Sequence, residues 1–310
     1  MNAPGRAFRG LVSARPVVIP DVNVAPMPML AAPGVILNGH AVDGFRGLEH
    51  ASYPDVLSHR LKLGLLVPAT NTSMEHELWG LIMGNRGPGR LQGVGLHATA
   101  VSTPAPRFAN AAELEQYKAQ FLGNLRVAVE QALLAQPQLL VMGMSLEHII
   151  HGLGGIEHTM NQVRAMTDVP WAAWHEAAAA ALNCLGARRI GLLTPFDRTG
   201  NDNAARLFTD LGYEVVASVG FSCAHAVHIA HVPEWAKEKA VLELLATPAH
   251  ALDAIVQCGT NMPLAALAER LEPIVGIPIL GINAVMLWHA LREAGIDAPL
   301  HGAGQLAREF

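Results

Sequence analysis

The sequence predicts an α/β protein built on parallel β-sheets with helices on both faces. From residue 61 onward, short apolar runs alternate with longer stretches in which apolar residues recur every three to four positions. The short runs fit buried strands, and the longer stretches fit amphipathic helices. Regular alternation of the two is typical of parallel sheets covered on both faces. At 310 residues the chain has room for two units of ordinary size.

The predicted elements follow one another along the chain in a repeated order. Strands are expected at residues 61–69, 93–101, 137–145, 169–175, 188–196, 213–221, 251–260 and 276–284. Helices are expected at residues 113–135, 176–187, 204–212, 264–276 and 284–295. The later strands repeat the layout of the earlier ones, with a strand, a Pro-containing loop and a helix. This repetition indicates a duplication at the level of the fold.

Three regions follow from this pattern. Residues 1–60 form a Pro-, Gly- and Ala-rich extension that is expected to be poorly ordered. Residues 61–180 form a first α/β domain and residues 181–283 a second, while the C-terminal helix within 284–310 is expected to pack back on the first domain. The extension lacks the compact apolar stretch of a secretory signal, which favours a cytoplasmic location.

Composition excludes several classes of function. No run of 18 apolar residues predicts a membrane span, and no basic stripe with interleaved aromatic residues predicts nucleic-acid binding. The three cysteines are widely spaced and contain no CxxC pair, so neither a disulfide framework nor a zinc knuckle is expected. No glycine-rich phosphate-binding motif follows a strand. The expected partner is therefore a small molecule; homo-oligomerization is left open.

Three loops at the carboxyl ends of predicted strands are the candidates for its binding site. They read VPATNTSME at 67–75, VMGMSLEH at 141–148 and VQCGTNMP at 256–263. Ligands of parallel α/β sheets lie beyond the carboxyl ends of the strands. Each loop is rich in small, hydroxyl and amide residues, so side chains and backbone N–H groups are expected to converge there.

Cys258 is the first candidate for chemistry. It follows a predicted strand directly and precedes a Gly-Thr-Asn turn that leads into a helix. Backbone N–H groups and the positive end of that helix are expected to lower the pKa of its thiol. The alternative is an inert buried cysteine, which is the usual role of a free Cys. Cys184 and Cys223 are interpreted as packing residues.

The other loop residues give weaker signals. Ser145 offers a hydroxyl donor, and Gly143 permits close approach of the backbone. Residues 71–75 also fit a helix cap. Two groups of histidines raise the question of a metal site, but neither matches a known ligand motif, so no metal is expected. These are His225, His228 and His231, and the cluster Glu147, His148 and His151.

Taken together, the loops resemble those of the aspartate/glutamate racemase superfamily. VPATNTSMEHE resembles the first loop of its maleate cis-trans isomerases, and LLVMGMSLEHIIHG resembles the corresponding loop of its arylmalonate decarboxylases. VQCGTNMP falls where the superfamily places its second catalytic cysteine. The resemblance runs from about residue 61 to residue 306. It implies two Rossmann-like domains with a pseudo-twofold relation and an active-site cleft between them.

The resemblance also implies a reaction. Racemases and maleate isomerases of this superfamily use two cysteines on opposite faces of the substrate, whereas here Gly143 stands at the first position and Cys258 at the second. A single thiol has no opposed base to remove a Cα proton. Loss of CO2 generates an enediolate that needs only one proton donor. The implied activity is therefore a cofactor-independent decarboxylation of aryl- or alkyl-substituted malonates.

In the implied mechanism, Cys258 protonates Cα from one face of the enediolate. One substrate carboxylate would be held by hydroxyl, amide and backbone N–H groups. The residues assigned to it are Asn71, Thr72, Met144, Ser145, Gly259 and Thr260. The departing carboxylate would lie in an apolar pocket that favours its loss as CO2. The residues assigned to this pocket are Pro68, Gly143, Phe196 and Asn261.

Two residues depart from the decarboxylase pattern. Met144 and Phe196 stand where hydroxyl donors are expected, and Asn71 or the pair Glu147 and His148 could compensate. Two other functions therefore stay open. One is a maleate isomerase or a racemase of a small dicarboxylate or amino acid, and the other is a non-catalytic carboxylate-binding protein.

Overall fold

The computed structural model describes residues 35–37, 40–42, 57–87, 89–103, 111–147 and 149–310. A short antiparallel ladder pairs β1 (Val35–Leu37) with β2 (His40–Val42), within the extension where the sequence predicted no strand. The other residues up to 56 lie outside the described residues. Most of the segment 1–60, which was predicted to be a poorly ordered extension, therefore lies outside them too.

The first large sheet has four parallel strands. They are β3 (Leu61–Pro68), β4 (Val94–Val101), β5 (Leu139–Met142) and β6 (Trp171–Ala172). Their order in the sheet is β4-β3-β5-β6, and every neighbouring pair is parallel. Thus β3, the first strand of this sheet along the chain, lies between β4 and β5.

The second large sheet repeats this arrangement. Its strands are β7 (Arg189–Thr194), β8 (Glu214–Gly220), β9 (Ala254–Gln257) and β10 (Ile279–Gly281). Their order is β10-β9-β7-β8, which is the order of the first sheet read from its other edge. The predicted duplicated α/β fold is confirmed, although several strands are shorter than predicted because the chain leaves the ladder before the site loops.

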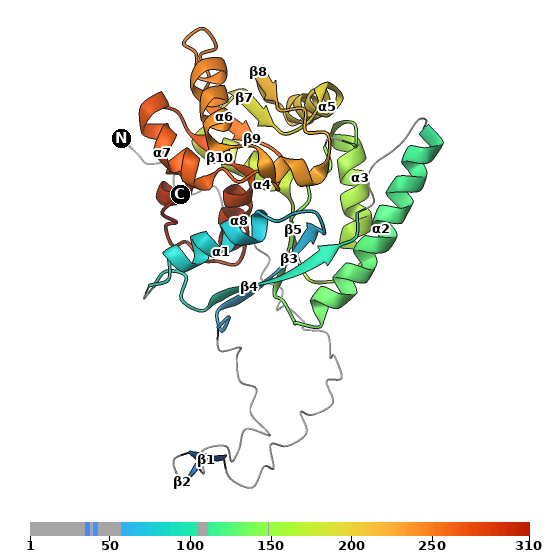
Figure 1. Cartoon of the computed structure of the whole chain (residues 1–310), viewed down its shortest axis with the longest axis vertical. Coiled ribbons are helices and arrows are strands. Elements are labelled where there is room, and N and C mark those ends of the chain that lie inside the picture. Colours follow the sequence, from blue (N-terminus) through green and yellow to red (C-terminus); the bar gives the residue numbers. More distant parts are fainter. Residues whose placement is uncertain (1–34, 38–39, 43–56, 88, 104–110, 148) are drawn as a thin grey trace.

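Helices flank both sheets (Figure 1). The α-helices are α1 (Met74–Gly84), α2 (Ala111–Leu133), α3 (Gly152–Arg164), α4 (Trp174–Leu185), α5 (Arg198–Asp210), α6 (Glu234–Lys239), α7 (Ala265–Val275), α8 (Ile282–Glu293) and α9 (Gln305–Glu309). A 3₁₀ turn covers Ala226–His231, and a π-helical turn covers Ala240–Leu245. The segments 152–164 and 226–245 were not among the predicted helices.

Helix α8 links the two halves of the fold. It contacts α1 and α4, and it also reaches β5, β6 and β10. Most of its side chains are buried on every side, as expected of a helix that is apolar all round. No helix in the described part of the chain combines the length and the hydropathy that a bilayer crossing requires.

The strand order determines where the site can form. In each sheet the chain first crosses to one side of the first strand and then to the other, so the connections reverse direction between the first and third strands. Loops on both sides of such a reversal leave a crevice at the carboxyl ends of the strands. Here those loops follow β3, β5, β7 and β9, and they carry all the predicted site residues.

Candidate active site

The three loops predicted from the sequence meet at Thr260. The Asn71 side-chain amide donates to the Thr260 hydroxyl at 3.1 Å, and this hydroxyl donates to the Gly143 carbonyl at 2.9 Å. Thr260 is buried, so these bonds are shielded from water. The loops after β3, β5 and β9 are therefore held together by one short chain of hydrogen bonds.

Asn261 makes a second link between the two halves. Its Nδ2 donates to the Thr70 and Ala226 carbonyls, and its Oδ1 accepts from the Thr72 N–H at 3.0 Å and from the Ser73 hydroxyl at 3.0 Å. Three of the four contacts are to the loop between β3 and α1, and the fourth is to the start of the 3₁₀ turn. The Thr72 side chain itself is exposed, so this residue is placed in the site through its backbone.

Asn71 also caps helix α1. Its Oδ1 accepts the backbone N–H groups of Ser73 and Met74 at 3.1 and 3.0 Å. The side chain of Ser73, at the N-cap position, makes no capping bond. The helix cap expected within residues 71–75 is therefore present and is supplied by Asn71, whose amide oxygen is occupied by this role.

Cys258 lies at the end of β9 and is buried, with 2% of its surface exposed. Its N–H donates to the Leu193 carbonyl at 3.0 Å, and the chain then turns sharply at Gly259, where φ is +90°. A Cβ at position 259 would lie 2.6 Å from Cγ of Pro195. The positive φ and the close approach of Pro195 both require glycine at this position. Phe196, next to Pro195, is buried on the same side of the turn.

The predicted lowering of the Cys258 pKa was wrong. Burial raises the pKa of this thiol well above its ordinary value, and the negative charge of Glu147 raises it further. Helix α7 begins only at Ala265, and the N–H groups of Leu264 and Ala265 already donate to Oε1 of Glu77 at 2.9 and 2.7 Å. Cys258 is therefore a neutral thiol, which suits a proton donor better than a nucleophile.

Gly143 stands where a side chain has no room. A Cβ built there would lie 2.7 Å from the Leu66 carbonyl oxygen and 2.7 Å from Cγ1 of Val67. The Gly143 N–H donates to the same Leu66 carbonyl at 2.8 Å, so the two backbones are in direct contact. A cysteine at this position would require the backbone to move. Pro68, the last residue of β3, follows Leu66 and Val67 and is half-buried.

Four backbone N–H groups around Cys258 have no acceptor. Within the described residues, the N–H groups of Met144, Ser145, Gly259 and Thr260 donate to nothing. The hydroxyl of Ser145 is also buried there without a hydrogen-bond partner. Buried donors are nearly always paired in folded proteins. The combination of unpaired donors and a neutral thiol matches a site for a carboxylate or an oxyanion.

Glu147 lies on the same loop, and the sequence indicated it only as a group that could, with His148, compensate for the missing hydroxyl donors. It is fully buried, and neither carboxylate oxygen makes a hydrogen bond of good geometry in the described part of the chain. Burial raises its pKa to about 7, while the nearby Ser145 hydroxyl and Trp174 indole N–H lower it in part. A glutamate amid apolar residues after a strand is the signal that could have identified it.

This carboxyl group makes protein stability depend on pH. Its pKa in the folded state, about 7, lies above its ordinary value of 4.5. Its contribution to stability is therefore fully present below about pH 4.5 and is lost as the pH rises through 7. We expect Glu147→Gln to abolish this loss, which is on the order of 3 kcal/mol. Urea unfolding of both proteins between pH 4.5 and 8.5 measures it, and equal slopes with pH would contradict the assignment.

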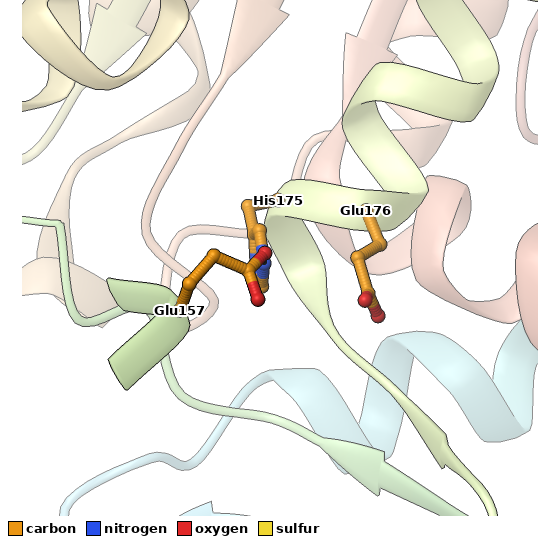
Figure 2. A group of neighbouring side chains, drawn as sticks. All are labelled: Glu157, His175 and Glu176. Atoms are coloured by element: carbon orange, nitrogen blue, oxygen red, sulfur yellow. The ribbon is translucent and has the colours of Figure 1, made fainter. Parts of the chain in front are cut away.

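A second group of ionisable side chains lies between α3 and α4. Figure 2 shows Glu157, His175 and Glu176 close together, and their ligand atoms all lie within 4.8 Å of one another. His175 Nε2 contacts Glu157 Oε1 at 2.9 Å. The guanidinium of Arg164 pairs with both carboxylates, at 3.6 Å from Glu157. This positive charge makes the group an ion-pair network that joins two helices, a poor setting for a cation.

The other candidate groups are a run of histidines and the residues near His151. His225, His228 and His231 lie along the 3₁₀ turn, with ring centroids 5.1 and 5.7 Å apart, and the Ala226 carbonyl of this turn accepts a hydrogen bond from Asn261. His151 contacts Asn203, and His148 lies outside the described residues. A cavity of about 330 Å³ is lined by α2, α3 and part of the loop at 146–150, and no residue of the Cys258 loop contributes to it.

Glu77 is a further residue that the sequence did not identify. Besides the two N–H groups at the start of α7, it accepts a hydrogen bond from the Asn283 amide at 2.8 Å. Asn283 in turn donates to the Thr260 carbonyl at 2.9 Å. Glu77 thus connects α1 of the first half to α7, the helix that follows the Cys258 loop. Through Asn283 it also holds the Thr260 carbonyl in place.

Fold and site together define a duplicated α/β protein with a buried cysteine among the strand-end loops of two parallel sheets. A family model described as arylmalonate decarboxylase matches residues 124–307. The chain belongs to the arylmalonate decarboxylase family. The resemblance inferred from the three loops is thereby confirmed.

The known proteins similar to this chain include maleate isomerases and arylmalonate decarboxylases. A maleate isomerase of Nocardia farcinica is 23% identical over 257 residues, which cover 80% of this chain and 96% of that protein. A structure of the Nocardia farcinica maleate cis-trans isomerase with a covalently bound succinylcysteine intermediate has a TM-score of 0.67 at 21% identity, covering 81% of this chain and 99% of that one.

Two further structures share the fold. The maleate isomerase of Pseudomonas putida S16 has a TM-score of 0.69 at 17% identity, covering 80% of this chain and 98% of that one. An unliganded arylmalonate decarboxylase has a TM-score of 0.59 at 19% identity, covering 81% of this chain and 100% of that one. At these identities the structural likeness establishes the fold alone.

Proposed function

We propose that this protein decarboxylates aryl- or alkyl-substituted malonates without a cofactor, with Cys258 as the proton donor. The observation that carries the proposal is the contrast between positions 258 and 143. Cys258 is a buried, neutral thiol, while position 143 has no room for a second cysteine. A site with one thiol can protonate one face of a carbanion, which is what decarboxylation requires.

The unpaired donors supply the second part of the reaction. One substrate carboxylate binds the N–H groups of Met144, Ser145, Gly259 and Thr260, together with the Ser145 hydroxyl. Cleavage of the bond to the other carboxylate leaves its electron pair on Cα and on the bound carboxylate as an enediolate. The N–H groups are held in place before the reaction, so they stabilise this developing charge at no reorganisation cost.

The surroundings of the departing carboxylate favour its loss. Pro68, Met144 and Phe196 present apolar atoms near the strand ends, and the latter two are buried. A carboxylate is poorly solvated beside such groups, whereas neutral CO2 is not. Transfer of the Cys258 proton to Cα then completes a monoacid whose configuration is determined by the face that the thiol occupies.

An isomerase of a small dicarboxylate is the second candidate. It is favoured by the similarity to maleate isomerases and by Glu147, a second ionisable group close enough to act on Cys258. Addition of a cysteine to a double bond would need a thiolate, and the raised pKa of Cys258 disfavours one. Decarboxylation is therefore the better-supported reaction.

Proton NMR in D2O distinguishes the candidates in one assay. The protein is incubated with phenylmalonate, an alkylmalonate, maleate and aspartate in turn. We expect a substituted malonate to give CO2 and a monoacid with one deuterium at Cα. Formation of fumarate from maleate, or exchange at Cα of aspartate without CO2, would overturn the proposal in favour of an isomerase or a racemase. Tight binding of a malonate without turnover would instead indicate a binding protein.

A further inference from the structure

The proposed reaction leaves Cys258 as a thiolate inside a buried site. This anion has to regain a proton before the next turnover, and only 2% of the cysteine surface is exposed to water. Burial strongly disfavours the charged form of the thiol. A nearby proton source inside the protein would therefore remove a slow step.

We propose that Glu147 is the proton relay residue that returns a proton to Cys258 after each turnover. This inference rests on the proposed function, since it requires Cys258 to give up its proton. It is carried by the position of Glu147 on the site loop, its complete burial and its lack of a hydrogen-bond partner within the described residues.

The position of Glu147 connects it to the Cys258 loop. It follows Gly143 and Ser145 on the loop after β5, and the Gly143 carbonyl accepts a hydrogen bond from Thr260 at 2.9 Å. Thr260 is two residues beyond Cys258 in the sequence. The electrostatic effect of the Glu147 charge on the thiol is a second sign that the two groups are near neighbours.

A purely structural role would leave a different pattern of contacts. Buried glutamates that support a fold have their oxygens bonded, because an unpaired buried carboxylate is costly. Glu77 receives three such bonds, and Glu272 accepts the N–H groups of Ile279 and Gln305 at 2.8 and 2.6 Å. Glu147 receives no hydrogen bond of such geometry in the described part of the chain, although the Ser145 hydroxyl and the Trp174 N–H are close enough to lower its pKa. Its oxygens are available for proton exchange.

Burial favours the acid form of Glu147 and outweighs the polar groups around it, two of which favour the carboxylate. The Ser145 hydroxyl comes from its own loop, the Trp174 indole from the start of α4, and the Cys258 thiol from the loop after β9. His175 follows Trp174 and is in contact with Glu157. Among the described residues, no cation lowers the pKa of Glu147, and at about 7 it keeps a large protonated fraction at neutral pH.

The relay balances as two proton transfers. The Cys258 thiolate takes the proton of the Glu147 carboxylic acid, which leaves a thiol and a carboxylate. Glu147 is itself fully buried, so its carboxylate takes a proton from a water molecule that enters the site as the product leaves, and hydroxide is released to solvent. Over one turnover the proton consumed at Cα is thus drawn from water, with no oxidant or other reactant involved.

Glu147→Gln tests the relay, because the amide keeps the shape but carries no acidic proton. Cys258 is protonated before the first turnover, so we expect the variant to release one CO2 per site at the wild-type rate and then to slow. Steady-state kcat should fall by about 10²-fold, a typical value for general acid catalysis. The wild-type kcat should decrease above pH 7, and the variant should lose this dependence. Glu147→Asp keeps a carboxyl group and should recover part of the steady-state rate.

The controls separate the relay from the proposed function. Glu130→Gln, an exposed change on α2, should leave the burst and the steady state unchanged. A Glu147→Gln variant whose burst is slowed together with the steady state, or one with full kcat and the wild-type pH profile, would overturn the relay.

Failure of the wild-type protein to release CO2 from any malonate would instead overturn the proposed function. In that case, alkylation of Cys258 by iodoacetamide still tests the coupling, and the reaction should begin at lower pH in Glu147→Gln.

Discussion

Replacing Cys258 by alanine is expected to lower kcat for decarboxylation by about 10²- to 10⁴-fold, the range measured for removal of a general acid. The enediolate would still form in the cradle of N–H groups, but it would have to wait for a proton from water. The KM should change little, because the thiol contacts Cα and not the bound carboxylate. Steady-state kinetics on the malonate identified by NMR measure both constants.

The other two cysteines supply a matched control. Cys184 and Cys223 are partly exposed, and neither belongs to the strand-end loops after β3, β5 and β9, since Cys184 lies in α4 and Cys223 follows β8. Cys184→Ala and Cys223→Ala should each keep wild-type kcat. A Cys258→Ala variant that retains full turnover would show that another group, Glu147 foremost, delivers the proton to Cα.

Ser145→Ala is expected to have the next largest effect, a decrease in kcat of about 10²- to 10³-fold, as for loss of one oxyanion donor. The hydroxyl of Ser145 is buried and makes no hydrogen bond of good geometry within the described residues, so its removal should cost the free protein little stability. The loss should therefore appear in the rate and not in the thermal stability. Differential scanning fluorimetry beside steady-state kinetics separates the two.

Ser102→Ala is the control for this change, because Ser102 follows β4 directly and its side chain is exposed. It should alter neither quantity. A Ser145→Ala variant that melts several degrees lower, with kcat intact, would indicate that the hydroxyl is structural and that the backbone N–H groups alone bind the carboxylate.

The fold could be predicted because its signals are local. Strand-like runs such as 61–69 and helix-like periodicity such as 113–135 are visible in short windows of sequence, and alternation of the two fixes the class. Helix α3 was missed because Gly152, Gly154 and Gly155 stand in its first turn and oppose helix formation in isolation. Packing against the rest of the fold stabilises it instead.

The site could be predicted only in part. Loop position was sufficient to bring Asn71, Gly143 and Thr260 together, because parallel strands deliver their ends to one edge. The pKa of Cys258 could not be obtained in this way. It depends on burial and on Glu147, which lies far away in the sequence. Glu77, equally distant, occupies the N–H groups of the helix end that was expected to act on the thiol.

The measurement that tests the central claim most directly is the decarboxylation of a prochiral aryl(methyl)malonate in D2O, with the product analysed for deuterium at Cα and for its enantiomers. A single thiol that protonates one face predicts CO2 release and a product with one deuterium and one enantiomer in large excess. The same excess should disappear together with the activity in Cys258→Ala. A racemic product from the wild-type protein, or exchange at Cα without loss of CO2, would contradict the assignment of Cys258 as the lone proton donor.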